Sequence, residues 1–484
     1  MKLKSVVSIV LVLVINGIYS QNNFYKTYSG GIFDVGQGVC ELPDEYYAIT
    51  GSSSSSSTAY SQAFLMIVDS LGNQKWTKFY GEDGDNWGRR VFHRQNQGFW
   101  IMGYSNAYGD GEFDFVVWKI DENGVLEWSK TIGTDDWDRL YDAVELTNGD
   151  FILVGEVEGD GSQGKDVYMC RIDSNGDLIW SRQIGNEGPD VARAVKLLND
   201  TTVFVAGGYA QGSNVEGLIL DLHIDGNVNQ LWTYNNYDST VFRDIDFYDD
   251  EIYVCGSAQI MSPDYVNSLV LRFDMGYNQV SSEIGNSEGD DLGTNILVLA
   301  NNKVYWTLQT IAPFHNPFPG GWDAFIYRYH RQLYFLGPSY RTSGYDDDIY
   351  HQLRETTDGG YIAVGHCSDD RFNISSGKNI MLVKVGPNDG YVQDADEGSD
   401  FLALPDIEND KNKNAYIYPN PVRNYIHIPE AMNNAKVIAR NIMGEHVNVR
   451  CFDDKIDVSN LSQGVYILDF YFDNTKKSFR IIKD

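Results

Sequence analysis

The sequence is short of positive charge. Its 484 residues include 37 Lys and Arg against 68 Asp and Glu, a formal net charge of −31. Almost all of this negative charge lies between residues 21 and 392. Proteins that bind nucleic acid neutralise its phosphates with clustered Lys and Arg side chains. The charge balance therefore excludes nucleic acid as an expected partner and favours cations or neutral sugars.

Proline and cysteine are also scarce. There are 12 prolines and 5 cysteines, beside 47 glycines, 10 Trp, 32 Tyr and 23 Phe. Many aromatics and glycines with few prolines favour strands joined by tight turns over a helical or disordered chain. The cysteines are odd in number, and their spacing matches neither a zinc motif nor a small disulfide framework. We expect small buried side chains, and the sequence leaves one disulfide open without choosing it.

Long apolar runs are lacking, except for one near the N-terminus. Residues 1–20 begin with Lys2 and Lys4, continue as the apolar run 6–15 and end before the polar Gln21. This run is shorter than the roughly 18 apolar residues that a membrane span needs, and the pattern is typical of a secretory signal peptide. We therefore expect export, cleavage near Ser20 and no transmembrane segment in the mature chain.

Motifs for catalysis are lacking too. The eight histidines form no His-Glu-x-x-His pair, and the chain contains neither a Gly-x-Ser-x-Gly elbow nor a glycine-rich phosphate loop before a helix. His351 and His366 fall in one repeat, where structural histidines are the commoner outcome. A paired-carboxylate glycosidase site stays open, because such a site has no sequence signature.

What the sequence does contain is a repeat. Three residue types recur every 52 residues, namely Trp76, Trp128, Trp180 and Trp232; Gly51, Gly103, Gly155 and Gly207; and Asp69, Asp121, Asp173 and Asp225. Each unit holds four short runs of β-branched and aromatic residues joined by turns such as Asn148-Gly149. A repeated four-stranded unit of about fifty residues predicts a β-propeller.

The register predicts seven blades. Phe24 occupies the position of Trp76 one period earlier, and Gly365 and Tyr391 mark the last unit. We therefore expect an all-β fold with a seven-bladed propeller over residues 21–392. The units resemble secreted bacterial propellers, most of them without assigned chemistry, and more distantly quinoprotein blades. Quinoprotein dehydrogenases usually have eight blades and adjacent cysteines, which this chain lacks.

The C-terminal residues carry a second set of motifs. These are a Pro-Asn-Pro segment at Pro419, Asn420 and Pro421, a central Gly444, the Leu-Ser-x-Gly-Val-Tyr strand with Gly464 and Tyr466, and a basic end with Lys483. Over residues 415–484 they resemble the C-terminal sorting domain of type IX (Por) secretion substrates, a small β-sandwich. The resemblance implies the type IX machinery as partner, passage across the outer membrane, and a final place at the cell surface or outside the cell. Residues 393–414 are charged and predict a flexible acidic linker.

The alternation of strands assigns the connections to two faces. The Asn-Gly turns lie on one face, and the acidic connections between blades lie on the other together with variable loops, which predicts a binding face there. Candidate ligand-binding residues on that face are Tyr108, Asp138, Phe314, Phe318 and Trp322. Aromatic side chains suit stacking on sugars or a partner's side chains, and packing on their own blade is the alternative.

Acidic stretches recur before the first strand of each repeat. They suggest Ca²⁺ at Asp83 and Asp85 and at Asp346 and Asp347, because Ca²⁺ takes several carboxylate ligands. No complete EF-hand loop is present, and capping of backbone N–H groups by these carboxylates is the favoured interpretation. No other cofactor is expected.

These observations favour a binding or scaffold module that contacts glycans or surface proteins. The alternative is a carbohydrate-active enzyme, a glycoside hydrolase or lyase, with a carboxylate site in the propeller mouth. Two or three carboxylates meeting there, at the separation of about 5–10 Å that glycosidases use, would favour the enzyme.

Overall fold

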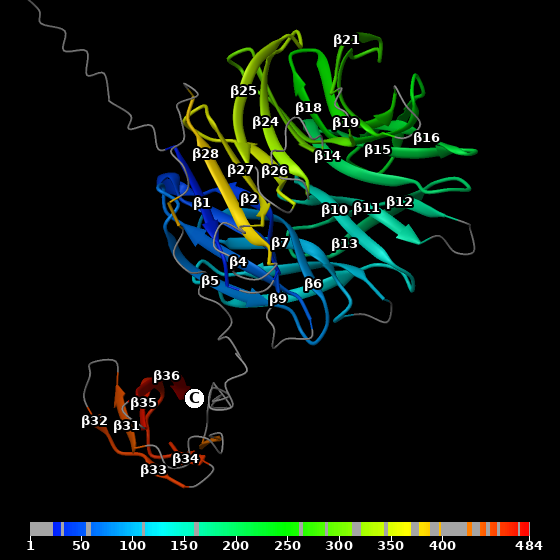
Figure 1. Cartoon of the computed structure of the whole chain (residues 1–484). Coiled ribbons are helices and arrows are strands. Elements are labelled where there is room, and N and C mark those ends of the chain that lie inside the picture. Colours follow the sequence, from blue (N-terminus) through cyan, green and yellow to red (C-terminus); the bar gives the residue numbers. More distant parts are fainter. Residues whose placement is uncertain are drawn as a thin grey trace, which may run out of the picture. The chain divides into compact units, whose positions relative to one another are not determined.

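Figure 1 shows the computed structural model of the chain. It describes residues 23–30, 33–54, 60–108, 112–158, 164–260, 265–285, 289–311, 321–342, 347–368, 377–387, 396–397, 424–427, 436–441, 446–452, 455–472 and 475–483. The predicted signal peptide and most of the predicted linker lie outside these ranges. The chain divides into two compact units, Met1–Leu404 and Pro405–Asp484.

The first unit is built from seven sheets, each with four antiparallel strands, to which the last sheet adds a short fifth strand. Blade one contains β2 (Phe33–Glu41), β3 (Tyr47–Ser54), β4 (Gln62–Val68) and β5 (Gln74–Tyr80). Blade two contains β6 (Asn86–Arg94), β7 (Gly98–Ser105), β8 (Asp114–Ile120) and β9 (Leu126–Ile132). Blade three contains β10 (Asp138–Glu145), β11 (Phe151–Glu158), β12 (Lys165–Ile172) and β13 (Leu178–Ile184).

The remaining blades follow the same order. Blade four contains β14 (Val191–Asn199), β15 (Thr202–Gln211), β16 (Asn214–His223) and β17 (Val228–Tyr234). Blade five contains β18 (Asp238–Tyr248), β19 (Glu251–Gln259), β20 (Asn267–Asp274) and β21 (Gln279–Ile284). Blade six contains β22 (Asp291–Val298), β23 (Lys303–Thr310), β24 (Asp323–His330) and β25 (Phe335–Thr342). Blade seven contains β26 (Ile349–Glu355), β27 (Tyr361–Cys367), β28 (Asn379–Val385) and β1 (Phe24–Tyr28).

The blades form a closed ring around an axis. The first strand of each blade contacts the first strand of the next, and β26 of the last blade contacts β2 of the first. The first strands are therefore the innermost ones. This architecture is the predicted seven-bladed β-propeller. Besides strands, the described residues form one short 3-10 helix, η1 (Pro43–Glu45).

The N-terminal strand closes the ring. In Figure 1 the blue β1 lies beside the yellow β28, and the two pair antiparallel from Phe24 with Lys384 to Tyr28 with Ile380. The last blade thus takes its outer strand from the other end of the unit, as the position of Phe24 in the repeat indicates. Tyr391, the predicted closing aromatic, lies outside the described residues. A two-residue strand, β29 (Asp396–Glu397), pairs in parallel with β1.

The repeated tryptophans contact glycines in the outer turn of the next blade. A Cβ added to Gly124 of blade two would lie 3.0 Å from the Trp76 ring of blade one, and Gly176 and Trp128 repeat this contact one blade further on. Both glycines have a positive φ, which favours glycine as well. The tryptophans therefore recur every 52 residues because, in successive blades, a tryptophan of the outer strand packs on the outer turn of the next blade.

The predicted equivalence of Asp225 and Asp173 is wrong. The residue equivalent to Asp173 is His223, which lies 50 residues further along the chain. The His223 N–H donates to the Asn227 carbonyl, just as the Asp173 N–H donates to the Asp177 carbonyl. The hairpin of β15 and β16 is two residues shorter than that of β11 and β12, which shifts the later strands. The predicted equivalence of Trp232 and Trp180 is wrong for the same reason, because Gln230 pairs with Asp221 as Trp180 pairs with Arg171. The Trp232 ring nevertheless stacks on Tyr277 of blade five, with the two ring centroids 5.3 Å apart.

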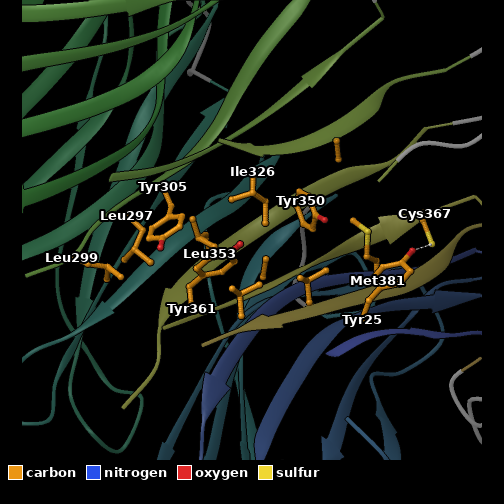
Figure 2. Packing of buried hydrophobic residues seen from close by; sticks show 14 residues of the cluster. Tyr25, Leu297, Leu299, Tyr305, Ile326, Tyr350, Leu353, Tyr361, Cys367 and Met381 are labelled. Atoms are coloured by element: carbon orange, nitrogen blue, oxygen red, sulfur yellow. Dashed lines mark hydrogen bonds between the residues drawn. The ribbon is translucent and has the colours of Figure 1, made fainter. Parts of the chain in front are cut away.

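The core of the propeller lies between the blades. Figure 2 shows the cluster between blades six and seven, where Leu297, Tyr305 and Ile326 face Tyr350 and Met381. Tyr25 of β1 belongs to the same cluster, and its hydroxyl donates to Cys367 Sγ at 3.8 Å. The closing strand is therefore held by side-chain packing as well as by its pairing with β28.

All five cysteines are free thiols. Cys170, Cys255 and Cys367 are buried, as the sequence predicts, whereas Cys40 is half-buried and Cys451 is exposed. Burial raises the pKa of the Cys40 thiol to about 12. This thiol is therefore protonated at neutral pH.

The second unit contains two small sheets. One has the order β30 (Tyr425–His427), β34 (Lys455–Asp457) and β33 (Arg450–Cys451). The other has the order β32 (His446–Val447), β31 (Lys436–Asn441), β35 (Gly464–Phe472) and β36 (Thr475–Lys483). Ile426, Ile456, Leu468 and Phe470 are among the buried residues of its core. The unit has an apolar core of its own, separate from those of the blades.

Candidate functional site

The two faces of the propeller differ. On the turn face, a carboxylate organises the outer turn of blades one to five, as when Asp121 Oδ1 accepts hydrogen bonds from the N–H groups of Asn123 and Val125. The bonds from Val125 and Asn123 lower the pKa of this exposed carboxyl. The loop face, defined as the face with the acidic connections and the loops between second and third strands, has no such common turn among its described residues. The strand order confirms the predicted division of the connections.

The acidic connections on the loop face are joints between blades. At the start of six inner strands, one backbone N–H donates to a carbonyl at or just before the start of the third strand of the preceding blade. We call these residues the joint ring: Asp34, Asn86, Asp138, Asp190, Asp291 and Asp348. All six side chains are buried. Their first role is therefore to connect blades.

Their carboxylates accept hydrogen bonds from the backbone, as the favoured capping interpretation predicts. Asp190 accepts from the N–H groups of Asn186 at 2.6 Å and Ala210 at 2.5 Å. Asp138, a predicted ligand-binding residue, accepts from the N–H and hydroxyl of Thr134 at 2.5 and 3.0 Å. Asp138 is 0% exposed, and burial raises its pKa to about 7. Asp138 is thus closed off from a ligand on the loop face.

Carboxylates do meet on this face, in repeated pairs. A side chain at Gly133 would overlap both Asp114 and Asp138, and one at Gly185 would overlap both Asp166 and Asp190. Each pair thus comes together over a glycine that follows an outer strand. The same pair of carboxylates occurs at two successive joints, so it belongs to the structure of the repeat. A catalytic pair of carboxylates is needed at only one place in the molecule, and the repeated pairs therefore give no support to a catalytic site.

The predicted Ca²⁺ residues are dispersed. Asp85 accepts from the Ser61 N–H at 2.8 Å, Asp347 accepts from the Trp322 N–H at 3.2 Å, and Asp83 is exposed. Asp346 lies outside the described residues. Within the described ranges no three His, Cys, Asp or Glu side chains gather closely enough to hold a metal ion. Asp85 and Asp347 thus take part in loop hydrogen bonding.

The predicted aromatic residues fall into two groups. Tyr108 packs on its own blade, where its hydroxyl accepts a hydrogen bond from Trp118 Nε1 at 3.4 Å. Trp322 is half-buried, and its carbonyl accepts from the Asp348 N–H at the joint of blades six and seven. Phe314 and Phe318 lie outside the described residues. The structure therefore brings none of the described candidates together.

A set of residues that the sequence did not single out lies around the axis. Every inner strand contains a β-bulge two to five residues after its start, where its pairing with the second strand shifts. The bulged residues, which we call the bulge ring, are Gln37, Arg89, Tyr141, Arg193, Arg243, Thr294 and His351. A bulge redirects the side chain that it carries, and all seven of these side chains are polar.

The bulge ring faces the axis. Arg89 Nη1 donates to Gln37 Oε1 at 2.7 Å, and Arg193 lies over the Tyr141 ring with its Cζ atom 4.0 Å from the centroid. The charge of Arg89 in blade two also acts on His351 in blade seven, although blade one separates them. Blades that are not neighbours approach each other only at the axis.

The electrostatics of the bulge ring are unusual for this acidic chain. Burial and Arg193 lower the pKa of Arg243 to about 10. Burial, His366 and Arg89 hold the pKa of His351 well below its ordinary value, so its ring is neutral. His351 Nε2 lies 2.9 Å from His366 Nδ1, which brings the two histidines of this repeat together. Positive charge is thus concentrated at the axis.

The predicted sorting residues lie in the second unit. Gly464 starts β35 and pairs with Lys483 of β36, and the Tyr466 hydroxyl donates to the Ser462 carbonyl at 2.9 Å. Pro419, Asn420, Pro421 and Gly444 lie outside the described residues. The Gly-Val-Tyr motif is therefore a central strand of the larger sheet.

The two units define an all-β protein with a seven-bladed propeller followed by a small C-terminal domain. Residues 416–484 match the secretion system C-terminal sorting domain, which indicates type IX sorting and implies secretion across the outer membrane. No curated protein matches the chain. Within the described residues, no helix is long and apolar enough to cross a membrane.

Solved structures similar to the chain are distant. The Neurospora crassa Pan2 WD40 domain is 12% identical, with 78% of this chain and 98% of that one covered and a TM-score of 0.42. Drosophila Semaphorin 2a is 8% identical, with 96% and 99% covered and a TM-score of 0.44. Polysaccharide lyase Uly1 is 9% identical, with 77% and 94% covered and a TM-score of 0.42. These similarities give no information about the activity or ligands of this chain. The assignment of a seven-bladed propeller rests on the seven sheets described above.

Proposed function

We propose that the secreted propeller is a binding or scaffold module that contacts glycans or surface proteins through its loop face. The observation that carries the proposal is the difference between the faces. The turn face repeats one hydrogen-bonded turn from blade to blade, whereas the loop face has connections that differ between blades. Variable connections on a rigid scaffold are where proteins place recognition.

Exposed aromatic side chains on the loop face support the proposal. Phe33 is 50% exposed, Tyr60 is 47% exposed and Tyr265 is 44% exposed, and all three lie at the start of an inner strand or in a loop between second and third strands. None of them follows the repeat. By contrast, exposed aliphatic residues of the outer strands, such as Leu126 and Leu178, recur from blade to blade.

The acids of the loop face favour this function over a glycoside hydrolase or lyase. The carboxylate pairs at Asp114 and Asp138 and at Asp166 and Asp190 are repeated and lie over glycines. Because these carboxylate pairs recur between successive blades, we interpret them as part of the contact between blades. An enzyme would need one pair that differs from the others and reaches a substrate.

The proposal also covers how the protein is exported and where the propeller is finally located. Residues 1–20 are a signal peptide, residues 21–392 the propeller, residues 393–414 a linker and residues 415–484 the sorting domain. The type IX machinery recognises the sorting domain, and the propeller ends at the cell surface or in the medium. Detection of the propeller on intact cells and in cell-free medium distinguishes these two places.

A glycan array probed with the labelled full chain tests the binding function. We expect saturable binding to a subset of glycans. The double variant Phe33→Ser/Tyr60→Ser is expected to weaken binding at least about tenfold, because an aromatic contact contributes on the order of 1 kcal/mol or more. The matched control Leu126→Ser/Leu178→Ser changes exposed residues of the outer strands and leaves binding unchanged.

Two results would contradict the proposal. One is the absence of binding to any glycan together with the absence of binding to intact cells. The other is the release of shortened or unsaturated sugars from the same glycans, which would establish the enzyme instead.

A further inference from the structure

The bulge ring contains three arginines that have no counter-charge among the residues that the structure describes. Arg193 and Arg243 make no hydrogen bond or ion pair with any residue that the structure describes, and Arg89 donates only to neutral groups. From this arrangement we infer that Arg89, Arg193 and Arg243 form a site at the propeller axis for an oxyanion, meaning a carboxylate, sulfate or phosphate group of a ligand. This site goes beyond the proposed function, because it requires no binding by the loop-face aromatics.

Charged residues that follow the bulge ring on the same inner strands are paired with charges of opposite sign. Further along the same inner strands, Arg90 Nε lies 2.5 Å from Asp142 Oδ1, and Lys196 Nζ lies 2.8 Å from Asp246 Oδ1. These cations and anions neutralise one another across neighbouring blades. The fold therefore pairs charges at the axis where they serve the blades alone, and the bulge ring departs from that pattern.

Burial makes the unpaired cations costly. The Nε atoms of Arg89, Arg193 and Arg243 are buried without an acceptor among the described residues, and the three side chains are only partly exposed. Groups buried in this way reduce stability unless something accepts their hydrogen bonds. An oxyanion satisfies two guanidinium groups at once, because the planar donor fork of Arg matches its oxygens.

The neighbours of the arginines suit this role. Tyr141 lies between two of them, with the Arg89 and Arg193 Cζ atoms 5.4 and 4.0 Å from its ring centroid. The aromatic face holds both guanidinium planes in position without neutralising them. Gln37 and the neutral His351 add polar groups from blades one and seven. The seven bulges therefore converge on one small polar region with excess positive charge.

Isothermal titration calorimetry on the full chain at low ionic strength tests the site. The probes are glucuronate, sulfate and phosphate, with chloride at equal ionic strength as reference, so that the three arms distinguish the kinds of oxyanion. We expect saturable binding of at least one probe. Arg243→Gln is expected to weaken it by about ten- to a hundredfold, because a hydrogen bond to a charged group contributes about 1.5–3 kcal/mol.

Two comparisons separate a ligand site from a structural role. Arg331→Gln removes a partly exposed guanidinium that pairs with Asp249 in the turn after β18, beyond the end of the inner strand, and is expected to leave binding unchanged. Arg243→Gln is expected to retain or raise the thermal midpoint while it loses the anion. The inference is overturned if no probe binds the wild-type chain, if the Arg331 variant loses binding equally, or if Arg243→Gln unfolds the propeller.

Failure here is distinguishable from failure of the proposed function. Glycan binding that depends on Phe33 and Tyr60, together with no binding of any oxyanion probe, supports the loop face and refutes the axis site. Oxyanion binding that depends on Arg243, together with no binding to glycans or to intact cells, gives the opposite result.

Discussion

The joint ring and the bulge ring sit three residues apart on the same inner strands, yet their polar side chains behave in opposite ways. The joint ring buries acids such as Asp190, whose oxygens accept backbone hydrogen bonds from the neighbouring connection. The bulge ring carries cations such as Arg193, which has no described acceptor. A repeat can therefore hold blades together with one polar layer and leave another for a ligand.

The largest effect is expected from the joint ring. Asp190→Ala removes the acceptor of two N–H groups in a site that is 0% exposed. Each buried donor left without a partner costs about 1–3 kcal/mol, so we expect a loss of roughly 3 kcal/mol or more, seen as a lower thermal midpoint. Asp225→Ala, which removes an exposed turn carboxylate, is the control and should cost little. Equal losses in the two variants would refute a special role for the joint ring.

A second effect concerns pH. Burial raises the pKa of Asp138 to about 7 from 3.8, so the folded state holds a proton that the unfolded state has released between these values. Stability therefore falls as the pH rises from about 4 to about 7, and between about pH 5 and pH 8 this group contributes a fall of roughly 3 kcal/mol. The measurement is the thermal midpoint at pH 5 and pH 8. Asp138→Asn should show a smaller fall than the wild type, and an identical fall would contradict the raised pKa.

A third effect tests the outer contact between blades. Gly124→Ala places a Cβ 2.8 Å from Lys78 Cδ and 3.0 Å from the Trp76 ring, at a φ of +75°. We expect a loss of about 1–3 kcal/mol in urea unfolding. Gly212→Ala has a φ of +62° with nothing within 4 Å, so it isolates the backbone contribution. A loss no larger than that of Gly212→Ala would show that the blade contact contributes nothing.

The smallest effect has the opposite sign. Arg243→Gln removes a cation whose pKa is lowered by burial and by Arg193, so the ligand-free protein should gain up to about 1 kcal/mol. Differential scanning calorimetry at low salt measures the shift, and added salt should reduce it. A clear loss of stability would place Arg243 with the joint ring, as a residue that the fold itself requires.

The repeat made much of the architecture predictable. The recurrence of Trp76 and Gly51 indicated four-stranded blades, and Phe24 indicated that the first strand completes the last blade. The spacing failed at Asp225, because a hairpin shorter by two residues shifts the strands after it. A sequence period gives only the number of residues between two positions. Two residues are structurally equivalent when they pair with the neighbouring strand in the same way, and a change in hairpin length alters that pairing.

The functional residues were less predictable. Acids such as Asp138 were visible as clusters, but a cluster in sequence does not say whether its carboxylates face solvent or a backbone N–H. Arg89, Arg193 and Arg243 share no motif, and the other blades carry different residues at the same place. Arg89 and Arg193 lie two 52-residue periods apart and are therefore equivalent in the repeat, but only the pairing of two strands shows that this position is a bulge.

The sequence by itself determined the blade, the number of blades and the sorting domain, because turns, strand alternation and packing aromatics are local and repeat with the chain. Tertiary structure decided where the charges act. Closing the ring buries acids such as Asp190 against the backbone and turns arginines such as Arg193 toward the axis. An overall charge of −31 therefore coexists with a positive centre, since the field at a site depends on which side chains the fold brings together there.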